Sequence, residues 1–145
     1  MSYARQLVDS YPRTATFDAV ALAATIDALN DCAEACIADA GADLSEHELL
    51  ALVKCIQLCQ DCADVCTATR NIISRQTDYH SGVTSLLLEA CVRICKSCGD
   101  ECEQHAKIHA HCRVCLKVCR RCEQACRGLV AVTKAETARY APSLS

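Results

Sequence analysis

The sequence predicts an all-α protein, an up-down-up-down antiparallel four-helix bundle with a cysteine-lined core. Two observations lead to this prediction. The chain has only 4 glycines and 2 prolines in 145 residues, too few for a β-sandwich or a loop-rich disulfide scaffold. Its 15 cysteines recur at helical spacings in four separate segments. A chain of this length is expected to form one domain.

The cysteine repeat has the pattern C-x3-C-x2-C-x3-C and occurs three times, with a half copy before it and one extra cysteine ahead of the third copy. The cysteines are Cys32 and Cys36; Cys55, Cys59, Cys62 and Cys66; Cys91, Cys95, Cys98 and Cys102; and Cys112, Cys115, Cys119, Cys122 and Cys126. At about 100° per residue, steps of four, three and four place the cysteines of one copy in a narrow stripe along a helix. The positions one and three after the first cysteine are apolar and position two is polar, so each stripe is expected to lie at the centre of a buried face.

Each stripe predicts one helix, and short turns are expected to join them. The predicted helices cover residues 14–40, 45–75, 82–106 and 109–137. Residues 1–13 are expected to form an N-terminal segment, 14–137 the bundle domain and 138–145 a flexible C-terminal tail.

Local signals mark the predicted turns. Gly41 can supply a left-handed end to the first helix. The stretch from Ser45 to Glu48 has the spacing of a capping box for the second helix. Gly82 lies in the next turn, and the last turn must be very tight near Lys107.

This connectivity gives the bundle two unlike ends. One end collects four of the five histidines: His47, His105, His109 and His111. The other end collects apolar residues: Leu22, Ile26, Ile72, Ile73, Leu86, Leu87, Leu88, Leu129 and Val130. We therefore expect a histidine-rich mouth at one end and an apolar plug at the other. His80 lies in the turn at the plug end and is expected to be inert.

The cysteines are expected to be free thiols. The N-terminus lacks the apolar region and the twin arginine of an export signal, so we expect a reducing, cytoplasmic location. An odd number of cysteines also fits a disulfide framework poorly. Leu or Ile would bury more apolar area at these positions, so a core lined with thiols indicates metal binding.

The spacing favours Cu(I) over other metals. Helical neighbours have Cβ atoms about 5–6 Å apart, so two sulfurs can hold one ion and a third can come from an adjacent helix. Cu(I) accepts both coordination numbers, and continuous sulfur columns favour storage of many ions over catalysis. We therefore expect a non-enzymatic Cu(I) storage and buffering protein, loaded with multiple Cu(I) ions per chain.

Three alternatives compete with copper storage. A zinc or cadmium thiolate buffer remains open, because cysteines pooled from facing helices could supply four ligands. A thiol oxidoreductase is disfavoured because the C-x2-C pairs lie inside helices, where thiolate activation is not evident. An iron–sulfur protein would show a different cysteine spacing.

Three histidines are candidate Cu(I) ligands at the mouth. His105 continues the third stripe three residues after Cys102, His109 lies three residues before Cys112, and His111 is adjacent to Cys112. Imidazole suits copper and is available in its neutral form at cytoplasmic pH. His47 is a weaker candidate, because its place in the capping motif already explains it.

Charged residues beside the stripes are expected to be solvated. The acidic ones are Asp61, Asp64, Asp100 and Glu101, and a basic run of surface or oligomer-face residues comprises Arg113, Lys117, Arg120 and Arg121. A net charge of −3 disfavours nucleic acid and anionic membranes as partners. No apolar run approaches the roughly 18 residues of a membrane span. Thr25 and Asp18 fall near the inward face of the first helix without a functional explanation.

The three tetrads, and the stretch from His111 to Cys122, resemble the four-helix-bundle copper storage proteins, specifically their cytosolic branch. The resemblance covers about residues 14–137. It implies a homotetramer of bundles filled with Cu(I), bound mainly by cysteine pairs, with copper entering at the histidine end. It also implies a ligand role for all 15 cysteines. Copper donor or acceptor proteins are further expected partners.

Overall fold

The computed structural model describes residues 2–13, 16–77 and 82–140, and it contains helices and no strand over those ranges. The five helices are α1 (Tyr3–Asp9), α2 (Ala19–Leu44), α3 (Leu49–Arg75), α4 (Val83–His105) and α5 (Ala110–Tyr140). The all-α prediction is therefore confirmed. None of the described helices is long and apolar enough to cross a membrane.

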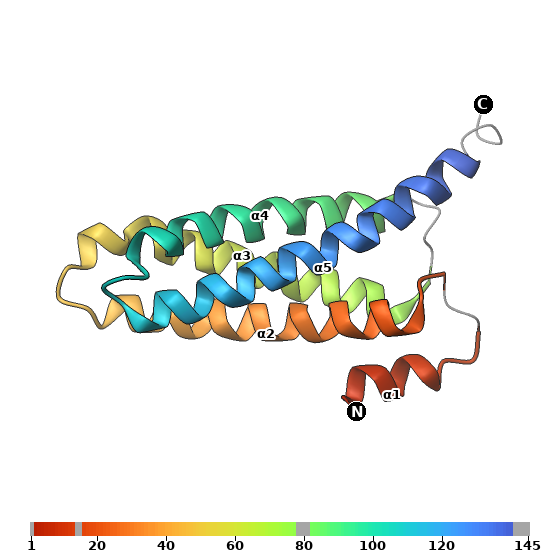
Figure 1. Ribbon diagram of the computed structural model, residues 1–145, viewed down its shortest axis with the longest axis horizontal. Coiled ribbons are helices and arrows are strands. Elements are labelled where there is room, and N and C mark those ends of the chain that lie inside the picture. The colour runs from red at the N-terminus through yellow and green to blue at the C-terminus, as the bar shows by residue number, and fades with distance from the viewer. Residues whose placement is uncertain (1, 14–15, 78–81, 141–145) are drawn as a thin grey trace.

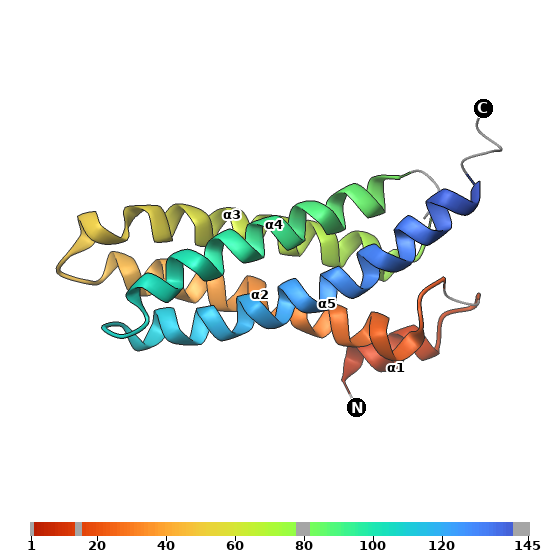
Figure 2. The same cartoon turned by 45° about the horizontal axis from the view of Figure 1, so that its top comes forward.

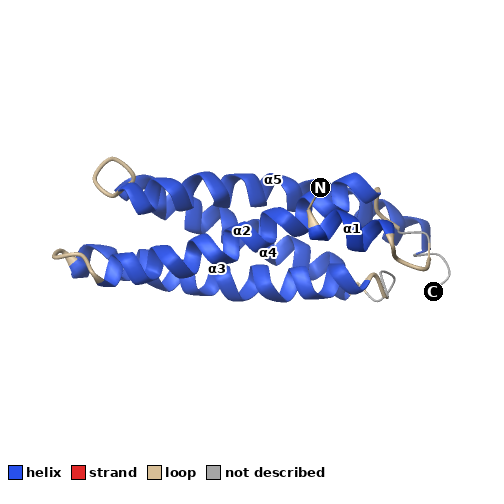
Figure 3. Ribbon diagram, turned by 90° about the horizontal axis from the view of Figure 1, so that it is seen from below, coloured by secondary structure: helices blue, strands red, loops and turns tan. Residues whose placement is uncertain are grey.

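The four long helices lie lengthwise beside one another (Figures 1, 2 and 3). α2 contacts α3 and α5, and α4 contacts the same two helices, so each long helix has two neighbours. The α2–α3 turn and the α4–α5 turn lie at the same end, on the left of Figure 1. Short α1 lies beside α2 near the opposite end.

α2 begins and ends later than the sequence predicted. Asp18 is its N-cap, with a side-chain oxygen that accepts a hydrogen bond from the backbone N–H of Ala21 at 2.9 Å, which accounts for this aspartate. The prediction that Gly41 ends the helix is wrong. α2 continues to Leu44 because its buried face continues through Ala40 and Asp43, and packing outweighs a glycine inside the helix.

The predicted capping box of the second helix is also wrong. Ser45 is the C-cap of α2, and its hydroxyl donates to the carbonyl of Gly41 at 3.3 Å. α3 begins at Leu49 after Glu48, which makes no side-chain capping bond. The four residues that resembled a cap therefore form the α2–α3 turn.

The remaining turns agree more closely with expectation. Gly82 precedes α4 with φ +81°, a left-handed conformation that suits glycine. The α4–α5 connection is tight, and the N–H of His109 donates to the carbonyl of His105 at 2.9 Å. α5 continues to Tyr140, beyond the predicted end at residue 137.

The helix α1 was not predicted. Ser2 caps it by accepting from the N–H of Arg5 at 3.1 Å, and its buried residues are Ala4 and Val8. The chain after α1 is tied to the end of α3, because the Tyr11 hydroxyl donates to the carbonyl of Arg75 and the Arg13 guanidinium to that of the C-cap Gln76. A seven-residue amphipathic helix gives too few repeats to be recognised from periodicity.

The apolar plug forms at the end opposite the histidine-rich mouth, though not from every predicted residue. Buried there are Leu22, Ile26, Ile73, Leu88 and Leu129, whereas Ile72, Leu87 and Val130 are half-buried. Leu86 is 68% exposed, so its assignment to the plug is wrong.

Each long helix also contributes one buried threonine: Thr25, Thr69, Thr84 and Thr133. The Thr25 hydroxyl donates to the carbonyl of Ala21 at 2.8 Å, which satisfies it inside the helix. His80 lies outside the described residues.

Candidate metal centre

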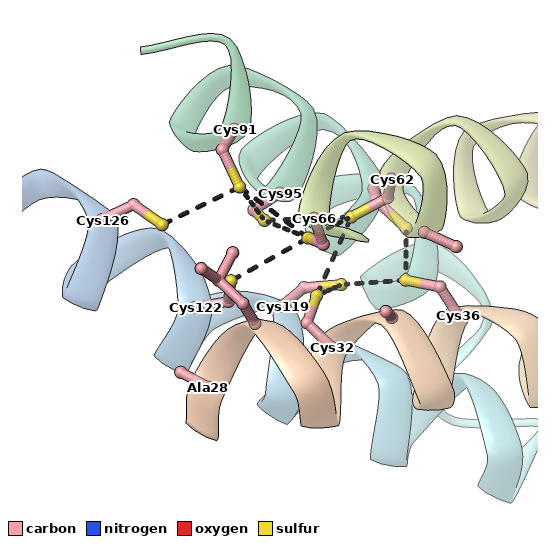
Figure 4. Packing of buried hydrophobic residues seen from close by; sticks show 14 of the residues in the cluster. Ala28, Cys32, Cys36, Cys62, Cys66, Cys91, Cys95, Cys119, Cys122 and Cys126 are labelled. Carbon is pink, nitrogen blue, oxygen red and sulfur yellow. Dashed lines mark hydrogen bonds between the residues drawn. The ribbon is translucent and has the colours of Figure 1, made fainter. Parts of the chain in front are cut away.

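All 15 cysteine side chains point into the space between the four long helices, and each is between 0% and 1% exposed. The prediction that every stripe faces the core is therefore confirmed. Figure 4 shows sulfurs from all four helices converging along the axis. The cysteines are free, without disulfides. Steps of three and four residues between cysteines of one helix explain their inward direction, because they keep the thiols on one line along the helix.

Sulfurs from different helices lie in contact along this column. The Cys59–Cys98 distance is 3.6 Å, and the Cys66–Cys95 distance is 3.7 Å, both between α3 and α4. Cys32 of α2 lies 3.8 Å from sulfurs of both α3 and α5. Any ion in the column would therefore find sulfurs from several helices within reach.

The sulfurs form overlapping groups of four, each with ligand atoms within 4.8 Å of one another. From the plug towards the mouth, the groups are Cys32, Cys66, Cys95 and Cys122; Cys32, Cys36, Cys62 and Cys119; Cys36, Cys98, Cys115 and Cys119; and Cys59, Cys98, Cys102 and Cys115. Each group shares at least one cysteine with the next. The column is therefore a continuous series of potential soft-metal sites.

The mouth contains buried carboxylates that the sequence analysis missed. Asp39 is 1% exposed, and its Oδ2 accepts from the thiols of Cys59 at 3.4 Å and Cys102 at 3.5 Å. Asp43 is also buried, and its Oδ1 accepts from the Cys112 thiol at 3.6 Å. Asp39 and Asp43 follow Cys36 by three and seven residues, so continuing the α2 stripe beyond its last cysteine would have located both.

Histidines join this carboxylate layer. His111 Nδ1 lies 2.5 Å from Asp39 Oδ1, and its Nε2 lies 3.0 Å from Glu46 Oε1. The rings of His109 and His111 stack with centroids 5.3 Å apart. The Cys112 sulfur is 3.6 Å from His111 Nδ1. Imidazole, carboxylate and thiol groups therefore meet where the column opens.

His105 forms a second contact at the mouth. Its Nε2 lies 3.1 Å from Glu101 Oε1, and Lys54 reaches the other oxygen of Glu101 at 3.6 Å. The prediction that Glu101 is solvated is wrong, because its side chain is buried beside the stripe. His47 is exposed in the α2–α3 turn and makes no described contact with the other histidines.

The mouth has an unusual electrostatic character. Burial raises the pKa of Asp39, and burial with nearby Cys55 and Asp39 raises the pKa of Asp43 to about 7. Burial lowers the pKa of His111, but its contacts with Glu46 and Asp39 outweigh this and raise it overall. Burial raises the pKa of the Cys112 thiol, so metal must displace a tightly held proton there.

Comparison with known proteins decides the family. Residues 18–131 match the family described as Csp, copper storage protein. The chain belongs to the copper storage protein family. A comparison with curated proteins finds no significant match.

Solved structures of other copper storage proteins resemble this one. A Streptomyces lividans copper storage protein, Ccsp, loaded with 10 copper equivalents is 48% identical, with a TM-score of 0.84 over 88% of this chain and 98% of that chain. A cytosolic copper storage protein from Streptomyces lividans with five coppers is 52% identical, with a TM-score of 0.75 over 77% and 93%. Cu(I)-bound BsCsp3 is 32% identical, with a TM-score of 0.66 over 74% and 95%.

The outer surface of this copper storage protein carries ion pairs that join its helices. Arg121 of α5 pairs with Asp31 of α2 at 2.7 Å, and Arg120 pairs with Asp100 of α4 at 2.6 Å. Gly99 allows this second contact, because a Cβ there would lie 3.1 Å from the Arg120 guanidinium. Two residues of the basic run therefore bind neighbouring helices of the same chain.

Proposed function

We propose that this chain stores Cu(I) by binding many ions through its 15 cysteines inside an up-down-up-down four-helix bundle. The observation that carries the proposal is the sharing of cysteines between successive groups of four. Bridging thiolates let adjacent Cu(I) ions share ligands, so capacity approaches about one ion per thiolate. One Cu(I) per thiolate also leaves the buried core near neutral.

The helix contacts support the bundle arrangement. Consecutive long helices contact each other, and the contact between α2 and α5 closes the ring. The turns at 45–48 and 106–109 are short, which favours antiparallel neighbours. The membership of the family and the 10 copper equivalents of its Streptomyces lividans member support the ligand roles proposed for the cysteines.

We infer that copper enters at the histidine end. His105, His109 and His111 are half-buried beside Cys102 and Cys112, whereas leucine and threonine side chains fill the other end. A neutral imidazole can pass a soft ion to a nearby thiol because both bind Cu(I). Storage also requires no substrate site, and the enclosed sulfurs suit a binding protein better than an enzyme.

The cellular setting follows from the thiols and from a relative. Free thiols persist in a reducing compartment, and the five-copper Streptomyces lividans structure is of a cytosolic protein, so we propose a cytoplasmic location. A homotetramer remains a prediction from the family resemblance, and copper donor or acceptor proteins remain predicted partners. Sedimentation of the metal-free and copper-loaded protein tests the oligomer.

A zinc or cadmium thiolate buffer is the second candidate function. The groups of four sulfurs also have the number of ligands that structural zinc prefers. We rank it behind copper because sharing of cysteines between groups suits bridged Cu(I) better than separate tetrahedral ions.

Anaerobic titration of the reduced protein with Cu(I) against a competing chelator tests the proposal. We expect many tight equivalents per chain, and the same titration with Zn(II) should saturate far earlier. Saturation after one or two Cu(I) ions, or greater zinc uptake per thiolate, would contradict copper storage.

A further inference from the structure

One group of four at the mouth differs chemically from the others. It combines Asp39 of α2 with Cys55 and Cys59 of α3 and Cys102 of α4, and all four residues are buried. The other groups described above contain only sulfur. A carboxylate oxygen is a hard ligand that Cu(I) does not favour, whereas Zn²⁺ accepts oxygen and sulfur together.

Four of the six ligand–ligand distances within this group are close to those around a tetrahedral divalent ion. With metal–sulfur bonds of about 2.3 Å and metal–oxygen bonds of about 2.0 Å, tetrahedral edges are about 3.8 Å between sulfurs and about 3.5 Å between sulfur and oxygen. Asp39 Oδ2 lies 3.4 Å, 3.5 Å and 3.8 Å from the sulfurs of Cys59, Cys102 and Cys55. The Cys55–Cys102 sulfur distance is 3.9 Å. All four ligand atoms lie within 4.8 Å of one another, so the two remaining sulfur–sulfur edges need to shorten by at most about 1 Å around one ion.

The surroundings hold the carboxylate in place. Asp39 Oδ1 contacts His111 Nδ1 at 2.5 Å, which leaves Oδ2 directed at the three sulfurs. Carboxylates and histidines in such pairs fix the orientation of metal ligands in many zinc sites. His111 is itself held by Glu46 at 3.0 Å. The oxygen ligand is therefore oriented before any metal arrives.

We propose that Asp39, Cys55, Cys59 and Cys102 form a four-coordinate site for one divalent cation of the zinc class in the copper-free protein. Binding forms three metal–sulfur bonds and one metal–oxygen bond, and the three thiols release their protons to solvent. No electron is transferred. This site rests on the proposed copper storage in one respect. When Cu(I) ions bind the three thiolates, the divalent ion is released to water.

Zinc titration of the full-length, reduced, metal-free protein tests this site. With a chromophoric chelator as competitor under anaerobic conditions, one Zn(II) equivalent should bind more tightly than any further equivalents. Co(II) in the same protein should give the intense visible absorption of a tetrahedral ion and a thiolate charge-transfer band. Both signals should reach their end points at one equivalent.

Substitution of the carboxylate is the decisive variant. Asp39→Asn keeps the shape but removes the anionic oxygen, and it should weaken the first zinc equivalent by more than the roughly 10–100-fold expected for losing an outer-shell partner. His111→Ala should weaken it by about 10–100-fold, because it removes that outer-shell partner. Circular dichroism checks folding, and Cys59→Ser offers a second test of the same site.

The matched control is Cys126→Ser, which removes a sulfur at the plug end. It should leave the tight zinc equivalent unchanged while lowering Cu(I) capacity. Unchanged zinc affinity in both Asp39→Asn and Cys59→Ser, several equivalents of equal affinity, or no tight zinc at all would overturn the proposed site. Cu(I) titration of the same samples is a separate readout, so failure of the zinc site and failure of copper storage are distinguishable.

Discussion

Leu88→Ala tests whether the apolar plug holds the metal-free fold. Leu88 is fully buried on α4, three residues before Cys91, whereas Leu86 on the same helix is 68% exposed. Truncating a fully buried leucine costs about 3–5 kcal/mol through lost burial and the cavity left behind. At about 2–4 °C per kcal/mol for a chain of this size, the melting temperature should fall by at least about 6 °C.

Thermal and urea unfolding of the reduced, metal-free protein, followed by circular dichroism, measures this cost. Leu86→Ala is the matched control and should change stability by less than about 0.5 kcal/mol. Cu(I) should raise the melting temperature of both variants, because it binds the folded state, and the copper capacity of Leu88→Ala should equal that of the wild type. A cost below about 1 kcal/mol for Leu88→Ala, or metal-free wild type that is already unfolded, would refute the conclusion that the plug stabilises the metal-free fold while the sulfur column binds copper.

Three further predictions concern the column, the mouth and the N-terminal segment. Cys95→Ser removes a sulfur with neighbours at 3.7 Å and 3.8 Å, so Cu(I) capacity measured by chelator competition should fall by about one ion or more. Asp43→Asn should stabilise the metal-free protein at pH 8. Burial raises the pKa of Asp43 from 3.8 to about 7, so ionisation of the carboxyl destabilises the folded protein as pH rises through that range. The gain in melting temperature of the variant should therefore vanish near pH 4. Arg13→Ala loses a 3.1 Å bond to the carbonyl of Gln76 and should lower unfolding stability by about 0.5–1.5 kcal/mol in urea.

Surface substitutions serve as controls for these predictions. Ala90→Ser adds a hydroxyl to the exposed side of α4 and should leave copper capacity intact, while Asp61→Asn should show no stabilisation that disappears at low pH. Full copper capacity in Cys95→Ser would mean that its sulfur is not a ligand. A stability gain for Asp43→Asn that persists at pH 4 would mean that its charge is not the cause. No change in Arg13→Ala would mean that the tie to α3 is weak.

The sequence predicted the core well because the cysteine pattern is repeated along the chain. Three tetrads at the same spacing define the inward face of α3, α4 and α5, and an error at one position would be corrected by the others. The mouth was predicted less fully, because Asp39 and Glu101 belong to residue types that are usually solvated. Continuing the α2 stripe beyond Cys36 would have located Asp39, but not its contact with His111 of α5. The contact of Glu101 with Lys54 of α3 likewise joins two helices, which the spacing within one helix does not indicate.

Helix ends were the least predictable part of the fold. Gly41 and Ser45 both carry strong local signals, yet tertiary packing of the α2 face extends the helix past the glycine and assigns the serine to its end. α1 escaped prediction for the opposite reason. Its pattern is short, and the chain that follows it is tied by two hydrogen bonds to carbonyls at the end of α3, some 63 residues away in sequence.

The buried plug has a consequence for the order in which stored ions can move. Leu88, Leu129 and Thr69 close one end of the column with side chains that are at most 2% exposed. An ion held by Cys91 and Cys126, whose sulfurs lie 3.8 Å apart beside that plug, would have the rest of the column between itself and the histidines. Ions would then leave the column in the reverse order of binding, so that the last ion bound is the first released. Copper at the plug end would form a slowly exchanging reserve, and copper at the mouth the fraction that responds first to demand.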